Sequence, residues 1–211
     1  MDISSITVNT HSSIRIDIGK IIYFDPFEID GSVGDADYIF ITHDHYDHYS
    51  PEDVKKILKS DTVLVVPQPM RKKVDKNTPV ENIIEVIQGQ TYETADFTFE
   101  TVPAYNVLKP FHSKNAGWVG YVLNIDGKRI YVAGDMDATK EAEQVKCDIA
   151  LIPIGGFYTM NPKDAAGLIN KIKPEYAIPT HYGKLVGKPE DGETFKKLVD
   201  DDIKVEIKLV F

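Results

Sequence analysis

Six consecutive positions in the first quarter of the chain concentrate side chains that bind metal ions. Three histidines and two aspartates fall within the run HDHYDH, namely His43, Asp44, His45, Asp47 and His48. The whole chain holds only 6 histidines. Histidine is the commonest metal-binding side chain, and carboxylates complete hard or borderline sites. A solvated polar loop would account for one such histidine, but H-x-H-x-D-H after an apolar run favours a metal site.

Two later polar residues also end apolar runs. Asp135 follows RIYVAG, in which Gly134 leaves room for close approach, and His181 follows YAIPT. Taken alone, a strand-end aspartate is often a turn former or helix cap, and a strand-end histidine is weak evidence. Ligand sets in open sheets gather beyond the carboxyl ends of strands, so the three features together predict a single metal centre.

The elements that must position these residues can be read from the hydrophobic pattern. In the first half, period-2 alternation predicts a hairpin of residues 13–18 and 21–24 and a strand at 38–42 that leads into the histidine run. Ser50 and Pro51 are typical of a helix start, so a helix should begin there and lead into a buried strand at 62–67.

The second half should begin as a meander and then alternate strands with helices. The expected meander strands lie at 91–94, 97–102, 117–125 and 128–134, with Asp126-Gly127 as the last tight turn. Later strands are expected at 148–154, 176–180 and 204–211, and helices at 162–172 and 193–199. Strands with helices on the outer sides indicate an α/β (α+β) protein in which helices cover packed sheets. No linker is visible, so residues 1–211 are predicted to form one domain.

Composition excludes several function classes. Among 211 residues, 33 Asp and Glu outnumber 24 Lys and Arg, giving a net charge of -9. No basic patch stands out, so we expect no nucleic-acid partner. Neither a signal peptide nor an apolar run long enough for a membrane span is visible. The single cysteine, Cys147, suggests a reducing compartment. We therefore expect a cytoplasmic protein that acts on a small molecule; the sequence does not indicate its oligomeric state.

The ordered motifs resemble a known superfamily. H-x-H-x-D-H, a later G-D and a later strand-end histidine resemble the metallo-β-lactamase superfamily over essentially the whole chain. Within it, four shorter segments resemble the branch that contains L-ascorbate-6-phosphate lactonase: HSS at 11–13, FDPF at 24–27, GDMD at 134–137 and PIGGFYTM at 153–160. The resemblance implies the four-layer αββα sandwich of the metallo-β-lactamase fold.

The resemblance also implies a ligand set for two neighbouring divalent ions. His43 and His45 would bind the first ion, Asp47, His48 and His181 the second, and Asp135 would bridge both. Zinc is the favoured metal, with Mn, Fe or Ni as alternatives for nitrogen and oxygen ligands. One or both sites could be filled.

One position departs from the superfamily pattern. Many relatives place a third histidine for the first ion where this chain has Asn106, and an amide oxygen is a poor zinc ligand. His112 could supply that imidazole, contact the substrate, or lie on the surface. His11 could line the pocket and Asp25 could orient a ligand imidazole, although a role in a turn is equally open for both. Tyr158 is expected near the mouth, where it could meet an anionic substrate.

The predicted activity is metal-dependent hydrolysis. A metal-activated water would attack a lactone or phosphoester of a small metabolite, with Asp47 as the catalytic residue that orients the water. The alternative is a non-catalytic metal- or ligand-sensing protein on the same fold, a hypothesis that rests on Asn106. Metal titration with a parallel activity assay distinguishes the two.

Overall fold

A computed structural model describes residues 2–78 and 80–211. The chain divides into two compact units, Met1–Val86 and Ile87–Phe211. Each unit contains one sheet, of 6 strands in the first and 7 in the second, and the fold is mixed α/β with four α-helices among the described residues. That the whole chain forms one domain stays a prediction.

The first unit is built on strands in sequential order. Its strands are β1 (Ile6–Thr10), β2 (Ser13–Asp17), β3 (Ile21–Phe24), β4 (Ala36–Phe40), β5 (Leu58–Pro67) and β6 (Asn82–Val86), and its helices are α1 (Pro51–Ile57) and α2 (Arg71–Asn77). β1 to β3 pair antiparallel, and β3 to β6 pair parallel. The predicted hairpin of β2 and β3 is confirmed.

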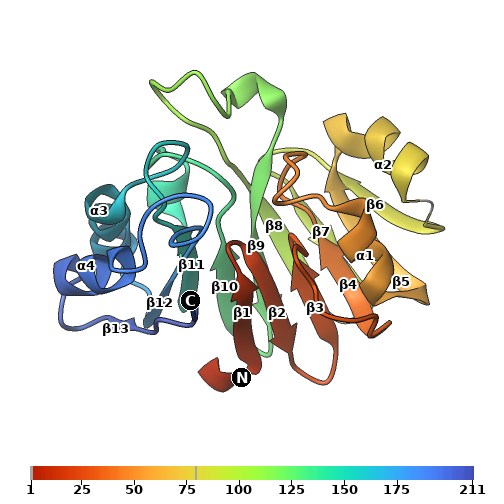
Figure 1. Ribbon diagram of the computed structural model, residues 1–211, viewed down its shortest axis with the longest axis horizontal. Helices are drawn as coiled ribbons and strands as arrows, with labels where there is room; N and C mark the ends of the chain where they lie inside the picture. The colour runs from red at the N-terminus through yellow and green to blue at the C-terminus, as the bar shows by residue number, and fades with distance from the viewer. Residues whose placement is uncertain (1, 79) are drawn as a thin grey trace. The chain divides into compact units, whose positions relative to one another are not determined.

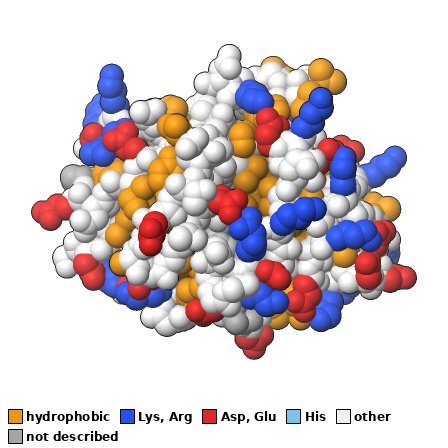
Figure 2. All heavy atoms as spheres, turned by 180° about the vertical axis from the view of Figure 1, so that it is seen from behind, with side chains coloured by type: hydrophobic (Ala, Val, Ile, Leu, Met, Phe, Trp, Pro, Cys, Tyr) orange, Lys and Arg blue, Asp and Glu red, His pale blue; other side chains and the backbone are white. Residues whose placement is uncertain are grey.

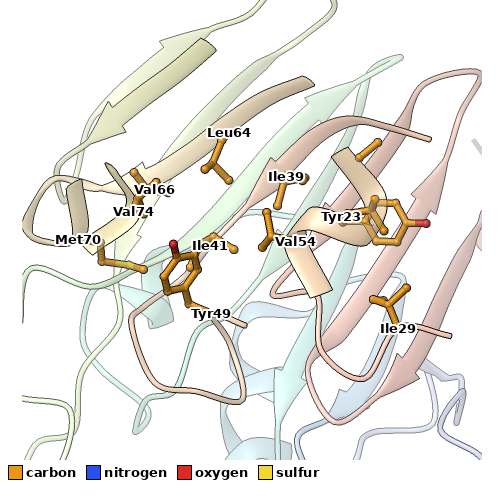
Figure 3. Packing of buried hydrophobic residues seen from close by; sticks show 12 residues of the cluster. Tyr23, Ile29, Ile39, Ile41, Tyr49, Val54, Leu64, Val66, Met70 and Val74 are labelled. Atoms are coloured by element: carbon orange, nitrogen blue, oxygen red, sulfur yellow. The ribbon is translucent and has the colours of Figure 1, made fainter. Parts of the chain in front are cut away.

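A compact apolar core fixes the helices of this unit on its sheet. Val54 on α1 and Val74 on α2 are fully buried in a cluster with Ile39, Leu64 and Tyr49, as Figure 3 shows. Because Tyr49 belongs to this core, the loop that carries the histidine run is anchored where it enters α1. Ser50 caps that helix by accepting the backbone N–H of Asp53, as the sequence predicts.

The second unit begins as the predicted meander and ends with parallel strands. Its elements are β7 (Thr91–Glu93), β8 (Thr98–Pro103), β9 (Val119–Ile125), β10 (Lys128–Val132), β11 (Ile149–Pro153), α3 (Pro162–Ile172), β12 (Tyr176–Thr180), α4 (Asp191–Leu198) and β13 (Lys204–Val205). β7 to β10 pair antiparallel and β10 to β13 pair parallel. In Figure 1, α3 (blue-green) and α4 (blue) lie side by side, in agreement with their packing contacts.

The sequence patterns did not predict three elements, β1, β6 and α2. They also predicted a last strand that is longer than the one observed. The last strand ends at Val205 instead of reaching residue 211. The end of the chain instead packs its terminal ring on Tyr182, with 5.4 Å between the Phe211 and Tyr182 ring centroids. Val210 and Phe211 are exposed, so the apolar alternation there lacks a neighbouring strand on which to form a ladder.

Charges of both signs are mixed on the face of the protein that Figure 2 draws. On the face in Figure 2, Lys and Arg side chains (blue) lie interspersed with Asp and Glu side chains (red). Over residues 2–78 and 80–211, no helix is long and apolar enough to cross a bilayer.

Asp53 provides a test of how the loop after β3 is held. Its carboxylate accepts the backbone N–H groups of Glu28 and Ile29 at 3.0 Å each, and Lys56 Nζ lies 2.8 Å away. Burial raises the pKa of Asp53, but Lys56, Ser50 and the two N–H groups outweigh it, so the pKa is lowered overall. Asp53→Ala should cost about 1–3 kcal/mol at neutral pH, because it leaves the buried N–H of Ile29 and the part-buried N–H of Glu28 without their acceptor.

The sign of the pH dependence follows from that direction. The unfolded carboxyl has an ordinary pKa of about 3.9, and the folded value lies below it. The contribution is therefore present above about pH 4 and is lost as the pH falls through the folded pKa. Urea unfolding at several pH values checks this, with Asp30→Ala, an exposed site in the same loop, as control. A deficit that does not shrink in acid would contradict the charge-based account.

Candidate metal centre

The histidine run forms a tight turn between β4 and α1. The backbone N–H groups of His48 and Tyr49 both donate to the carbonyl of His45, at 3.1 and 2.8 Å. This turn brings side chains together that a regular strand would point to opposite faces. His43 and His48 are buried, whereas His45 and Asp47 are partly exposed. The Nε2 atom of His43 lies 3.1 Å from Nδ1 of His45.

Asp25 orients two of these histidines, His48 directly and His43 through Thr42. One carboxylate oxygen accepts Nδ1–H of His48 at 2.7 Å and the Thr42 hydroxyl at 2.6 Å, and the other accepts the Thr42 backbone N–H at 2.7 Å. With its proton given to Asp25, the Thr42 oxygen accepts from Nδ1 of His43 at 2.9 Å. Both imidazoles therefore present Nε2 as the atom that can bind a metal ion.

Burial and hydrogen bonding shift the pKa of Asp25 in opposite directions. Burial raises its pKa, whereas the neighbouring His48 and the hydrogen bonds from His48 and Thr42 lower it; burial wins and the pKa is raised overall. The carboxylate is only 2% exposed. A buried carboxylate is tolerated where partners satisfy its lone pairs, as Thr42 and His48 do here.

His11 lies against the catalytic aspartate of the sequence prediction. Its Nε2 atom is 3.1 Å from Oδ2 of Asp47, and the ligand atoms of His11, Asp47 and His48 all lie within 4.8 Å of one another. Asp44, by contrast, points to Lys73, whose ammonium donates to its carboxylate at 3.2 Å. Within the histidine run, Asp47 and His48 therefore belong to this cluster, whereas Asp44 forms an ion pair with Lys73 at the surface.

The second unit holds its own cluster around Asp135. The Oδ2 atom of this carboxylate lies 3.3 Å from Nε2 of His112 and 3.1 Å from Nε2 of His181. All three side chains are at least 95% buried. Asp135 follows β10 and His181 follows β12, and parallel pairing through β11 places the carboxyl ends of both strands at one edge of the sheet.

Asn106 braces His112. Its side-chain amide donates to the Tyr158 carbonyl at 2.7 Å and lies 3.2 Å from Nδ1 of His112, while its backbone N–H donates to the His112 carbonyl at 2.7 Å. His112 is 4% exposed, which excludes the surface alternative for this residue. Tyr158 is 37% exposed and meets Asn106 through its backbone.

Four of the candidate site residues adopt a left-handed backbone that non-glycine residues seldom use. The φ angles are 52° at His11, 44° at Asp25, 54° at His112 and 57° at His181. Such conformations cost on the order of 1–3 kcal/mol each and concentrate at functional sites. Each of the four lies where the chain leaves a strand or changes direction in a loop, so the strain accompanies side chains aimed into a cluster.

The donor atoms of both clusters suit a divalent cation. Imidazole nitrogens and carboxylate oxygens are the ligands that zinc and similar ions take. In the second cluster two Nε2 atoms converge on one buried carboxylate oxygen, and in the first Asp25 leaves Nε2 of His48 as the ligand atom. Each cluster by itself therefore has the chemistry of a metal half-site.

Comparison with known proteins identifies the family. The model of the β-lactamase superfamily domain matches residues 5–181. A UPF0173 metal-dependent hydrolase of Thermococcus onnurineus is 32% identical over 209 residues, which cover 93% of this chain and 92% of the relative. The chain belongs to the metallo-β-lactamase superfamily.

Other members of the superfamily agree. A UPF0173 metal-dependent hydrolase of Methanopyrus kandleri is 32% identical, with 93% of each chain covered. The crystal structure of a protein from Parabacteroides distasonis, described as a candidate metal-dependent hydrolase, matches with a TM-score of 0.82 and 30% identity over 97% of this chain and 93% of that one. The superfamily resemblance and the fold predicted from the motifs are confirmed; the lactonase branch stays a prediction.

Sequence reasoning missed one residue that orients the candidate ligand histidines. Thr42 links Asp25 to His43, and its only signal in the sequence is its place directly before the histidine run. Asp25 itself was predicted as a residue that orients an imidazole, and its hydrogen bond to His48 has that form.

Asp25→Asn tests the orienting role. The amide can keep the shape but cannot accept from both His48 and Thr42 with a full negative charge, so metal affinity should fall about 10- to 100-fold. Competition against a chelator of known affinity measures this without any substrate. Asp61→Asn, at a side chain that is 76% exposed, should leave the affinity unchanged. An unaltered affinity in Asp25→Asn would show that His48 needs no orienting carboxylate.

Proposed function

We propose that this protein is a metal-dependent hydrolase that cleaves a lactone or phosphoester of a small metabolite. The observation that carries the proposal is the pair of buried imidazole–carboxylate clusters at strand ends, in a chain whose curated relatives are named metal-dependent hydrolases. The L-ascorbate-6-phosphate lactonase-like segments are the reason for placing lactones first.

The superfamily pattern supports a ligand assignment. We propose His43 and His45 for a first ion, Asp47, His48 and His181 for a second, and Asp135 as a bridge. One or two divalent ions are expected, with zinc favoured and Mn, Fe or Ni as alternatives. When bound, such ions supply an activated water at neutral pH and stabilise charge on the leaving oxygen.

The protein side chains would then orient the reacting groups and accept or hold protons. Asp47 Oδ2 lies 3.1 Å from His11 Nε2, within hydrogen-bond distance, and 3.7 Å from His48 Nε2. We propose that it orients the attacking water and accepts a proton from it, and that His11 keeps it in place. A small molecule is the expected substrate, and the net charge of -9 is the reason for expecting no nucleic-acid partner.

Asp47→Asn tests the catalytic assignment. The amide keeps the shape but loses the charge and the proton acceptor, so turnover should fall at least about a hundredfold. Some metal should remain bound, because other ligands are unchanged. Wild-type activity should rise with pH through roughly 6 to 8, since histidine ligands must be neutral. The measurement is a pH–rate profile against a lactone and phosphodiester panel, with metal content determined on each sample. A fully active variant would refute the assignment.

His112→Ala separates the two remaining roles of that histidine. If its imidazole binds an ion, metal content and turnover should fall together. If it contacts substrate, metal content should hold while turnover falls. Elemental analysis and kinetics on the same preparation decide this, with Lys184→Ala as an exposed-loop control. Unchanged metal and unchanged turnover would remove His112 from the site.

A further inference from the structure

A large apolar hollow opens beside the Asp135 cluster within the second unit. It has a volume of about 1210 Å³, compared with roughly 300–1,000 Å³ for typical small-molecule sites. We call it the aromatic pocket; its apolar lining comes from Leu108, Pro110, Phe111, Phe157, Gly167 and Leu168.

The exposed rings and aliphatic groups at this pocket are unusual for a protein surface. Leu108 is 94% exposed, Val107 59% and Phe157 70%. The ring of Phe111 contacts those of Phe157 and Tyr158, with centroids 5.6 and 4.8 Å apart. Contiguous exposed apolar surface of this kind marks a binding site for an apolar group.

The charges that line the pocket are largely engaged with one another. Lys109 Nζ lies 2.5 Å from Asp137 Oδ1 and donates to the Thr159 carbonyl at 2.6 Å, and Glu143 pairs with Lys171 at 2.6 Å. Three carboxylates and two ammonium groups line the hollow. With Lys171 counted beside Glu143, the ammonium groups balance the carboxylates, so a phosphate would find no excess positive charge here, whereas an uncharged apolar group would meet the exposed rings.

The walls of the pocket are the loops that carry the metal half-site. Residues 107–111 lead directly into His112, Asp137 lies two residues after Asp135, and the Tyr158 carbonyl accepts the amide of Asn106. The pocket and the Asp135 cluster therefore share their loops, although none of His112, Asp135 and His181 lines the pocket itself.

Gly167 leaves the floor of the pocket open. It lies inside α3, where glycine costs roughly 1 kcal/mol relative to alanine, and a Cβ atom built on it would meet nothing within 4 Å. Its neighbours Ala166 and Leu168 are buried and anchor the helix. A larger side chain at 167 would project into the open space on this side of the pocket without disturbing the helix.

From these observations we propose that the aromatic pocket binds the apolar side chain of an uncharged substrate. The class that follows is a lactone or ester with an alkyl or aryl substituent. This rests on the proposed hydrolase function for the reacting end of the molecule, but the pocket itself needs no metal ion to bind the apolar end.

The experiment compares γ-lactones whose alkyl substituents lengthen from methyl to octyl. Binding is measured by calorimetry on the full chain, and hydrolysis on metal-loaded protein. Affinity should rise roughly three- to fourfold for each methylene group buried. Gly167→Leu should abolish that rise while retaining thermal stability, and Phe157→Ala should weaken octyl binding at least fivefold. Leu198→Ala, on α4 and 43% exposed, is the matched control and should behave as wild type.

The outcomes separate the pocket from the hydrolase proposal. Chain-length-dependent binding without hydrolysis supports the pocket and contradicts the lactonase activity. Hydrolysis that is indifferent to chain length, or a dependence that survives in Gly167→Leu, overturns the pocket and leaves the hydrolase. Absence of lactone binding also overturns the pocket proposal. If sedimentation then shows that the wild type self-associates and that Gly167→Leu abolishes this, the surface is a contact with a second copy of the chain.

Discussion

The histidine-rich loop of the first unit depends on one buried carboxylate. Asp25 follows β3, its backbone N–H donates to the carbonyl of Phe40 on β4 at 2.9 Å, and its side chain accepts hydrogen bonds from Thr42 and His48. Removing a carboxylate from water is costly unless hydrogen bonds satisfy it. The same bonds that offset this cost fix the orientation of two imidazoles, so the stability of the loop and the geometry of the ligands come from a single interaction.

The second unit reaches a comparable result by a different arrangement. Parallel pairing of β10, β11 and β12 brings the ends that carry Asp135 and His181 together, whereas His112 comes from a long loop after β8. That loop needs external support, and Asn106 supplies it by hydrogen bonding to the Tyr158 carbonyl. Asn106, which suggested a lost ligand and hence a sensor, is in the structure a brace for the neighbouring histidine.

The parts of the fold that sequence could predict were those with strong local signals. α3 begins and ends at the predicted residues because Asn161 caps it, Pro162 opens it and its apolar spacing is regular. α2 has a lysine-rich sequence with one buried residue, Val74, so no periodicity revealed it. Among site residues, the run and the strand ends were visible as motifs. The roles of Thr42 and Asn106 depend on contacts between segments distant in sequence or on hydroxyl and amide orientation, which no local pattern encodes.

The glycine at position 167 separates two properties that are coupled in many enzymes: which molecules fit, and how the protein folds and reacts. The helix that carries it is secured by the buried face of Ala165, Ala166, Leu168 and Ile169, and the candidate metal ligands lie on other segments. Changes in side-chain size at this one position could alter which molecules fit without altering folding or reaction chemistry. Substrate range could therefore diverge among relatives by single substitutions here, while the histidines and aspartates stay the same.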